Sequence, residues 1–261
     1  MERFHTAVRY LKAFTPPSLF RLANWRKSGC IDSIHLHRFN QSQIELRGGK
    51  YAHSDRWIAS EIFVYEQYIP PFPVATDRVR CIVDVGANVG YSIVFFAFQF
   101  PHAHIVAFEP HPKHIDQIRH HLQINKLESR VTLYPAAAGP TNGQVALSDR
   151  EAESSITIGM VDETSLSVPM LDWFALVPVG SIDILKIDIE GAEFALMTDR
   201  RFDDVAGRTK ALALEWHMTE SYPNAHSWCK ERLMNLGFMV SEGAIQYDQK
   251  AGTIWAFRNV K

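Results

Sequence analysis

The sequence is poor in the features that mark several classes of protein. It has three cysteines, too few and too widely spaced for a disulfide framework or a zinc set: Cys30, Cys81 and Cys229. No apolar run approaches the ~18 residues of a membrane span, and the first residues lack the apolar core of a signal peptide. A net charge of −2 lacks the basic surplus of a nucleic-acid binder. These absences predict a cytoplasmic protein with no membrane span and no nucleic-acid partner.

One glycine-rich turn lies between an apolar strand and an apolar helix. Residues 84–90 read DVGANVG, follow the apolar residues 81–83 and precede the apolar run 91–96. Gly86 and Gly90 allow the backbone to bend and to approach a ligand closely. A strand that leads through such a turn into a helix is expected to offer free backbone N–H groups and the positive end of the helix dipole. The pattern predicts a loop that binds a nucleotide-like cofactor.

The spacing of the glycines narrows the choice of cofactor. The dinucleotide pattern G-x-G-x-x-G is absent, because Asn88 stands where a middle glycine would help. Glu109 ends the next apolar run, about 20 residues further on, where a carboxylate would bind a ribose diol. Its alternative role is that of an acid beside the helix starting near Pro112. NAD and S-adenosylmethionine both carry a ribose, but the missing glycine and the strand-end acid Asp84 favour S-adenosylmethionine.

Three segments together resemble the FkbM family of S-adenosylmethionine-dependent methyltransferases. They are 84–90, Phe108-Glu109-Pro110, and 185–193, which read LKIDIEGAE. Glu61-Ile62-Phe63 with Tyr68 resembles the segment before the first strand in that family. The resemblance extends from about residue 57 to about residue 240. It implies O-methylation of a hydroxyl on a small molecule, sugar or secondary metabolite.

The pattern of apolar runs predicts an α/β chain with the Rossmann-like class I methyltransferase fold. We expect a doubly wound seven-stranded sheet that ends in an antiparallel hairpin. Its strands are expected at 81–85, 104–109, 130–134, 183–188, 210–216, 237–240 and 253–258, and its helices at 90–99, 112–125, 192–198 and 225–236. The insertion at 135–182 is expected to hold short strands near 144–147 and 155–158 and a short helix at 171–176.

Residues 1–77 are predicted to form an N-terminal helical extension that acts as a lid, and 78–261 the methyltransferase domain. The extension should contain two helices, through Phe4 to Phe14 and Leu19 to Trp25, a hairpin within 33–46 and a helix over 57–68. Its basic surplus leaves contact with an anionic membrane or an acidic carrier protein as the alternative.

The catalytic candidates lie at the carboxyl ends of two expected strands. Asp188 is the first choice, as a base or as the group that positions the amino tail of the cofactor. His217 is the second, because its ordinary pKa suits proton abstraction near neutral pH; its alternative role is to cap a strand. Glu215 shares a side with His217. A divalent metal on Asp188, Glu215 and His217 is not favoured, because no close-spaced ligand motif supports it.

Cofactor and acceptor contacts are predicted from the loop positions and the resemblance. Small side chains after the third strand leave room for an adenine ring at Ala136 and Ala137. The predicted cofactor-binding residues are Asp84, Gly86, Ala87, Asn88, Gly90, Tyr91, Glu109, Pro110, Ala136, Ala137 and Asp188. The predicted acceptor-binding residues are Tyr68, Ser155 and Glu190, of which Ser155 could also be a plain turn serine.

Two further predictions concern charged side chains. Lys186 lies inside a buried strand and needs partners, so we expect it between Asp84 and Glu215 in a buried carboxylate–ammonium–carboxylate row. Four histidines on or next to the helix over 112–125 are expected to form a solvated face rather than a metal site: His111, His114, His120 and His121.

Two other functions stay open on the sequence alone. They are a nicotinamide-dependent oxidoreductase and a non-catalytic protein that keeps the cofactor fold. The sequence does not identify the acceptor, and it leaves the oligomeric state open, including a homodimer.

Overall fold

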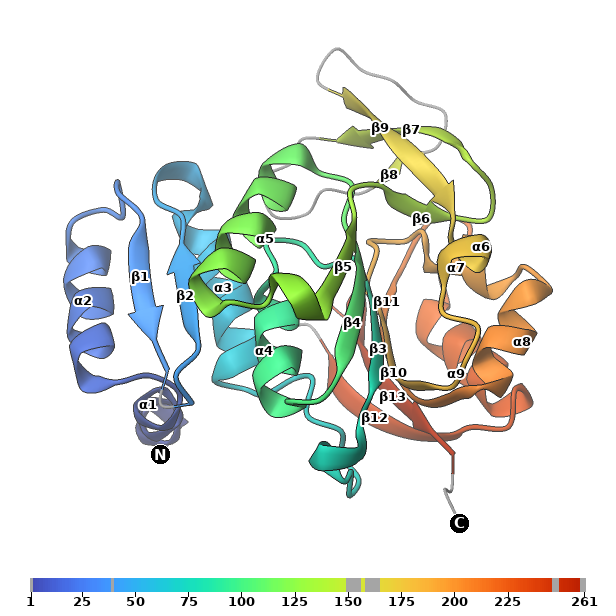
Figure 1. Ribbon diagram of the computed structural model, residues 1–261, viewed down its shortest axis with the longest axis horizontal. Helices are drawn as coiled ribbons and strands as arrows, with labels where there is room; N and C mark the ends of the chain where they lie inside the picture. The colour runs from blue at the N-terminus through green and yellow to red at the C-terminus, as the bar shows by residue number, and fades with distance from the viewer. Residues whose placement is uncertain (1, 39, 149–155, 158–164, 246–248, 259–261) are drawn as a thin grey trace.

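A seven-stranded, mostly parallel sheet forms the centre of the molecule (Figure 1). The computed structural model describes residues 2–38, 40–148, 156–157, 165–245 and 249–258. The strand order is β12-β13-β11-β10-β3-β4-β5, and β13 runs antiparallel to both of its neighbours, β12 and β11. The strands are β3 Cys81–Val85, β4 His104–Phe108, β5 Val131–Tyr134, β10 Ile182–Ile187, β11 Thr209–His217, β12 Met239–Ile245 and β13 Ala251–Phe257. The predicted sheet and its C-terminal hairpin are confirmed.

Helices cover both faces of this sheet (Figure 1), which explains why its central strands are apolar on both sides. On one face lie α4 Tyr91–Gln99 and α5 Pro112–Asn125; on the other lie α7 Glu193–Met197, α8 Arg201–Gly207 and α9 Ala225–Asn235. Strand order reverses between β3 and β10, and ligands of such sheets bind at the carboxyl ends of the strands beside that reversal. The sequence did not predict α8.

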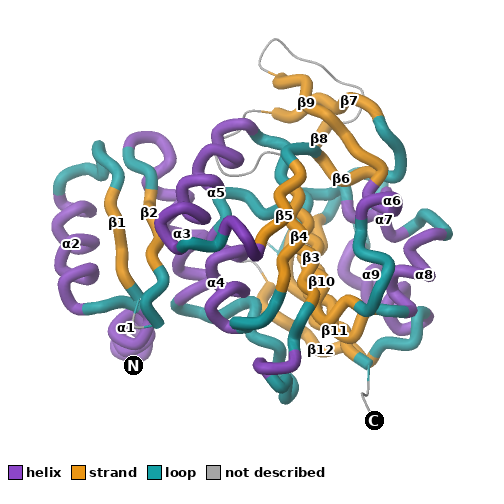
Figure 2. Tube along the Cα trace, viewed as in Figure 1, coloured by secondary structure: helices purple, strands orange, loops and turns teal. Residues whose placement is uncertain are grey.

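The N-terminal extension packs beside α4 (Figure 2). It consists of α1 Glu2–Ala13, α2 Pro16–Lys27, the antiparallel hairpin β1 Ile34–His37 and β2 Gln43–Leu46, the 3-10 helix η1 Gly49–Tyr51, and α3 Ala52–Phe63. A second 3-10 helix, η2 Thr76–Arg78, leads into β3. The helix expected over 57–68 starts and ends five residues earlier. A left-handed residue, Glu66 (φ 57°), turns the chain after it and brings Tyr68 into the core.

The insertion after β5 forms a small sheet of its own, at the top of Figure 1. Its order is β6-β9-β7-β8, from β6 Ala137–Gly139, β7 Gly143–Ser148, β8 Ile156–Thr157 and β9 Ser165–Asp172. The short helix α6 Trp173–Leu176 follows. The strands expected near 144–147 and 155–158 correspond to β7 and β8, although residues 155 and 158 lie outside the described part. Strand β9 was missed, and residues 171–172 belong to it rather than to the expected helix.

No helix in the described part of the chain is long and apolar enough to cross a membrane. The three cysteines carry free thiols.

Candidate active site

Two adjoining cavities open at the carboxyl ends of β3, β4 and β10. The narrower one is lined by Gly86, Asn88, Phe108, Glu109, Pro110, His114, Ala136, Ala137, Ala138, Asp188, Ile189 and Glu190. The wider cleft, about 850 Å³, runs along α3 and includes Arg9 of α1, Tyr68, Glu61 and Glu215. Both are lined by Gly86, Asn88, Asp188 and Glu190. The two cavities therefore meet at the ends of β3 and β10.

The glycine-rich turn is shaped by close contact with β10. Gly86 has a φ of 87°, and a Cβ there would lie 1.7 Å from the carbonyl oxygen of Asp188, so no larger residue fits. The N–H groups of Gly86 and Ala87 both donate to the Phe108 carbonyl at 3.0 Å. The expectation that this turn offers free N–H groups is therefore wrong for these two residues, because they bind the end of β4 instead.

Glu109 is held at the end of β4 by three donors. Its carboxylate accepts from the N–H of Asn88 (2.8 Å) and from that of His111 (2.9 Å), and His114 Nδ1 lies 3.3 Å from Oε1. Glu109 is only 5% exposed, yet it lines the narrower cavity. A carboxylate fixed in this way keeps acceptor capacity for a ligand hydroxyl.

Lys186 is buried beneath the junction of the two cavities. Its Nζ lies 3.2 Å from Asp84 Oδ1 and 3.3 Å from Asp188 Oδ2, and it donates to the Gly86 carbonyl at 2.7 Å. Burial opposes its charge, but Asp188 and Asp84 together raise the pKa of Lys186. The need for partners is confirmed. The expected row of Asp84, Lys186 and Glu215 is wrong in its third member. In the register of β10 and β11, Lys186 lies opposite Ala213 rather than Glu215. The second ion-pair partner is Asp188, and the charge of Glu215 raises the pKa of Lys186 only from a longer distance.

Asp84 and Tyr68 contact the ion pair of Lys186 and Asp188 from two sides. Asp84 is fully buried, accepts a hydrogen bond from Ser92 Oγ at 2.6 Å, and lies below the cavities rather than in their walls. The Tyr68 hydroxyl donates to Asp188 Oδ2 at 3.2 Å. Burial and the charge of Asp188 raise the pKa of Tyr68 well above its usual value, so it stays a phenol and a donor.

Two carboxyl groups that face the wider cleft titrate near neutral pH. Burial and the charge of Asp188 raise the pKa of Glu215 to about 8 and that of Glu61 to about 7. Gln67 Nε2 donates to Glu215 Oε2 at 3.1 Å and to Thr253 Oγ1 at 2.9 Å, which orients the Glu215 carboxyl group. A pKa near the working pH suits a general base.

His217 is not available as the base that its ordinary pKa suggested. Its Nδ1 lies 3.3 Å from Glu193 Oε1 and its Nε2 lies 3.4 Å from Glu190 Oε2. Burial opposes its charge, but Glu193 and Glu190 raise the pKa of His217 to about 10. The buried Glu193 also accepts from the N–H groups of His217 and Gly191, both at 2.8 Å. His217 is therefore a cation that joins the end of β11 to the turn after β10.

The potential metal ligands that lie close together in the structure differ from the three residues that the sequence suggested. Asp188, Glu190 and His217 have ligand atoms within 4.8 Å of one another, whereas Glu215 is not in this group. A metal needs a neutral imidazole, and His217 is protonated at neutral pH. These residues therefore fit a hydrogen-bonded charge cluster better than a metal centre.

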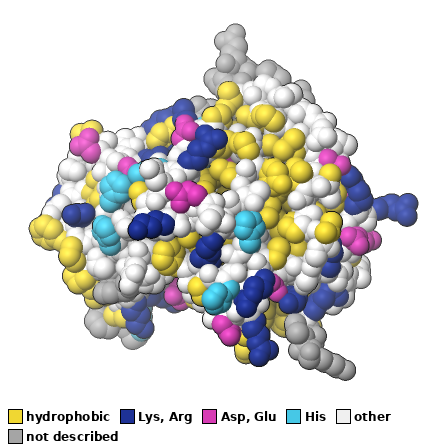
Figure 3. Space-filling view, in the orientation of Figure 1, with side chains coloured by type: hydrophobic (Ala, Val, Ile, Leu, Met, Phe, Trp, Pro, Cys, Tyr) yellow, Lys and Arg dark blue, Asp and Glu magenta, His cyan; other side chains and the backbone are white. Residues whose placement is uncertain are grey.

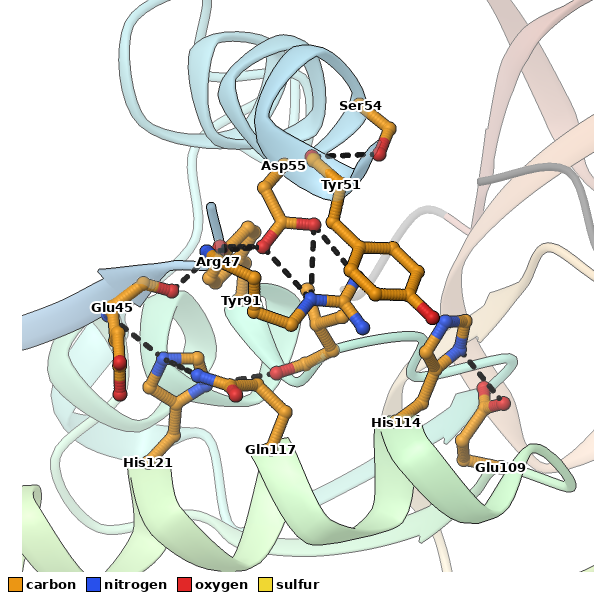
Figure 4. Close-up of polar contacts among 11 residues, drawn as sticks. Glu45, Arg47, Tyr51, Ser54, Asp55, Tyr91, Glu109, His114, Gln117 and His121 are labelled. Atoms are coloured by element: carbon orange, nitrogen blue, oxygen red, sulfur yellow. Dashed lines mark hydrogen bonds and ion pairs between the residues drawn. The ribbon is translucent and has the colours of Figure 1, made fainter. Parts of the chain in front are cut away.

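The histidines of α5 are not a solvated face, contrary to the expectation. His114 and His121 are buried, and their ring atoms meet partners on other elements (Figure 4). His111 is buried at the N-cap of α5, where its Nδ1 accepts from the Lys113 N–H, and only His120 is partly exposed among the four. His121 Nδ1 lies 2.8 Å from the Val89 carbonyl, and its Nε2 accepts from the Glu45 N–H at 2.9 Å. Burial lowers the pKa of His121 to about 4, so it stays neutral with its proton on Nδ1.

Most predicted site residues lie in the cavity walls. Seven of the predicted cofactor-binding residues line the narrower cavity, and Ala87, Tyr91, Tyr68, Glu190, Asp188 and Glu215 line the wider cleft. Asp84, Gly90 and His217 are not among the described lining residues. Ser155 lies outside the described residues. Sequence reasoning missed His114, Gln67 and Trp57 as lining residues, and used Glu61 only for the resemblance.

The sheet order and the paired cavities define a class I methyltransferase fold. A family model described as the methyltransferase FkbM domain matches residues 84–238. The chain therefore belongs to the FkbM family of methyltransferases, whose methyl donor is S-adenosylmethionine.

Comparison with a solved FkbM methyltransferase agrees on the fold. The methyltransferase FkbM from Methylobacillus flagellatus KT has a TM-score of 0.51 and 12% identity, over 82% of this chain and 56% of that one. An O-methyltransferase family protein from Burkholderia thailandensis has a TM-score of 0.47 and 14% identity, over 80% of this chain and 59% of that one. No curated protein matches the sequence.

Proposed function

We propose that this protein transfers the methyl group of S-adenosylmethionine to a hydroxyl of a small molecule or sugar. The observation that carries the proposal is the shared wall of the two cavities. One cavity offers a fixed carboxylate beside small side chains, and the other is wide enough for a small-molecule ligand. They meet at Asp188, where a donor and an acceptor would be in contact.

The narrower cavity fits the cofactor by its chemistry. Glu109 would accept from the ribose hydroxyls, and the small Ala136 and Ala137 would flank the adenine ring. Asp188 and Gly86 lie at the junction, where the methionine part would lie. S-adenosylmethionine, when bound, supplies an electrophilic methyl group on a sulfonium centre.

Glu215 is the best candidate to remove the proton of the acceptor. A hydroxyl is a weak nucleophile at neutral pH and gains from a base placed within hydrogen-bond reach. Glu215 faces the cleft, is oriented by Gln67, and has a pKa near 8. Asp188, held by Lys186 and Tyr68, would position the reacting groups instead. His217, as a cation, would keep Glu190 in place.

We propose that residues 1–77 act as a lid that selects the acceptor. The outer wall of the wider cleft comes from α3, from the turn that carries Gln67 and Tyr68, and from Arg9. Arg9 lies over the ring of Tyr65, 5.3 Å from its centre, at the same wall.

A labelled-donor experiment tests the function. Purified protein is incubated with S-adenosylmethionine carrying a deuterated methyl group and with pooled hydroxyl-bearing metabolites, and products are identified by mass spectrometry. We expect the label on an oxygen, and its loss with Glu215→Gln while cofactor binding persists. Label on a nitrogen would refute the hydroxyl acceptor, and no transfer to any compound despite cofactor binding would favour a non-catalytic protein.

A further inference from the structure

We infer that His35, Glu45 and His120 form a site for a divalent transition-metal ion, with Zn²⁺ as the best-fitting probe. The three side chains come from β1, β2 and α5, and none of them lines either cavity of the candidate active site. A metal there would join the N-terminal hairpin to the methyltransferase domain. This inference is independent of the proposed function.

The ligand atoms already converge. Glu45 Oε2 lies 2.7 Å from His120 Nε2 and 3.7 Å from His35 Nε2, and all three ligand atoms lie within 4.8 Å of one another. In a tetrahedral zinc site with bonds of about 2.0–2.2 Å, neighbouring ligands are about 3.3–3.5 Å apart. Shifts of less than about 1 Å would therefore bring both contacts of Glu45 to the distance that zinc requires, and the two imidazoles would close on each other from within 4.8 Å.

The backbone of Glu45 is fixed on both sides (Figure 4). Its N–H donates to His121 Nε2 at 2.9 Å, and its carbonyl accepts from the Tyr91 hydroxyl at 2.8 Å. Asn125 of α5 bonds both the N–H and the carbonyl of Gln43, each at 2.8 Å. Since the strand and the helix are held together by other contacts, the ligands need little ordering on binding.

A hydrogen-bonded ion pair alone does not account for this geometry. His120 Nε2 is buried and, among the described residues, makes no hydrogen bond of acceptable angle, although it lies 2.7 Å from the carboxylate. Two imidazoles directed at one carboxylate oxygen are a typical set for zinc. The side chain of His35 is 45% exposed, which leaves an entry path and a place for a water ligand. Figure 3 shows histidine side chains on the surface over this hairpin.

Calorimetry with zinc chloride on the untagged full chain tests the site. We expect one Zn²⁺ per chain, and affinity at least tenfold weaker for His35→Ala and for Glu45→Gln, because each loses a direct ligand. His226→Ala is the matched control, since His226 is a partly exposed histidine 2.7 Å from a single carboxylate, Glu242; its zinc affinity should equal that of the wild type.

A melting experiment on the same proteins gives a second readout. Zinc should raise the melting temperature of the wild type and of His226→Ala, but not that of His35→Ala. His35 is on the exposed side of β1, so its removal should leave the fold intact without metal. Equal zinc affinity in wild type and His35→Ala, or a zinc effect lost in His226→Ala, would overturn the inference.

Discussion

Replacing Lys186 with methionine should destabilise the fold and weaken cofactor binding together. The ammonium is 2% exposed and lies between Asp84, which is fully buried, and Asp188. Methionine keeps the packing volume but leaves the carboxylates without their counter-charge. Removing one partner of a buried ion pair costs about 3–5 kcal/mol. At about 2 °C per kcal/mol for a chain of this length, the melting temperature should fall by about 6–10 °C.

Lys210→Met is the matched control for this substitution. Lys210 lies on the neighbouring strand β11 and pairs with Asp183 at 2.6 Å, but its side chain is 49% exposed. An exposed pair contributes at most about 1 kcal/mol, so this variant should melt within about 2 °C of the wild type. Thermal unfolding followed by circular dichroism compares the two. If Lys186→Met melts as close to the wild type as Lys210→Met does, the buried charge group does not stabilise the site.

Three further predictions test other parts of the site. Glu215→Gln should lower the rate of methyl transfer by about 10²–10⁴-fold, and the wild-type rate should rise with pH through about 8; a flat pH profile would exclude Glu215 as the base. His217→Gln should lower the free energy of unfolding by about 3 kcal/mol at pH 6. Because the folded-state pKa of His217 is raised to about 10, its charge stabilises the folded state fully below pH 6.5 and progressively less as the pH rises to 10. Denaturant titrations should therefore show the difference in stability between this variant and the wild type shrinking toward pH 10. Arg9→Gln should raise the acceptor KM severalfold without changing cofactor affinity in steady-state kinetics; unchanged KM would argue against the lid.

The central sheet could be predicted because its strands are short apolar runs bounded by turns. The order of β3, β4 and β10 and the site at their ends then follow from the rules for doubly wound sheets. Strand β9 was missed because Pro169 interrupts its apolar pattern and is unfavourable inside a strand. The end of α3 was misplaced because the left-handed Glu66 that turns the chain before Tyr68 has no clear signal in the sequence.

The roles of the histidines could not be predicted from periodicity. His121 and His114 look like surface residues of an amphipathic helix, yet they are buried because Val89, Glu45 and Glu109 supply partners from other elements. His217 looked like a neutral base because Glu193, 24 residues away, is not adjacent in sequence. Lys186 was different: a lysine in an apolar strand requires partners, and only the identity of the second one needed the structure.

Calorimetric binding of S-adenosylmethionine to the wild type and to Glu109→Gln tests the central claim most directly. The wild type should bind S-adenosylmethionine and not NAD. Glu109→Gln should lose about 1–3 kcal/mol of binding free energy, or roughly 5- to 150-fold in affinity for S-adenosylmethionine. The control Glu231→Gln, at an exposed position, should bind S-adenosylmethionine with the affinity of the wild type. Binding of NAD in place of S-adenosylmethionine, or equal affinity of Glu109→Gln and wild type, would contradict the assignment of this cavity.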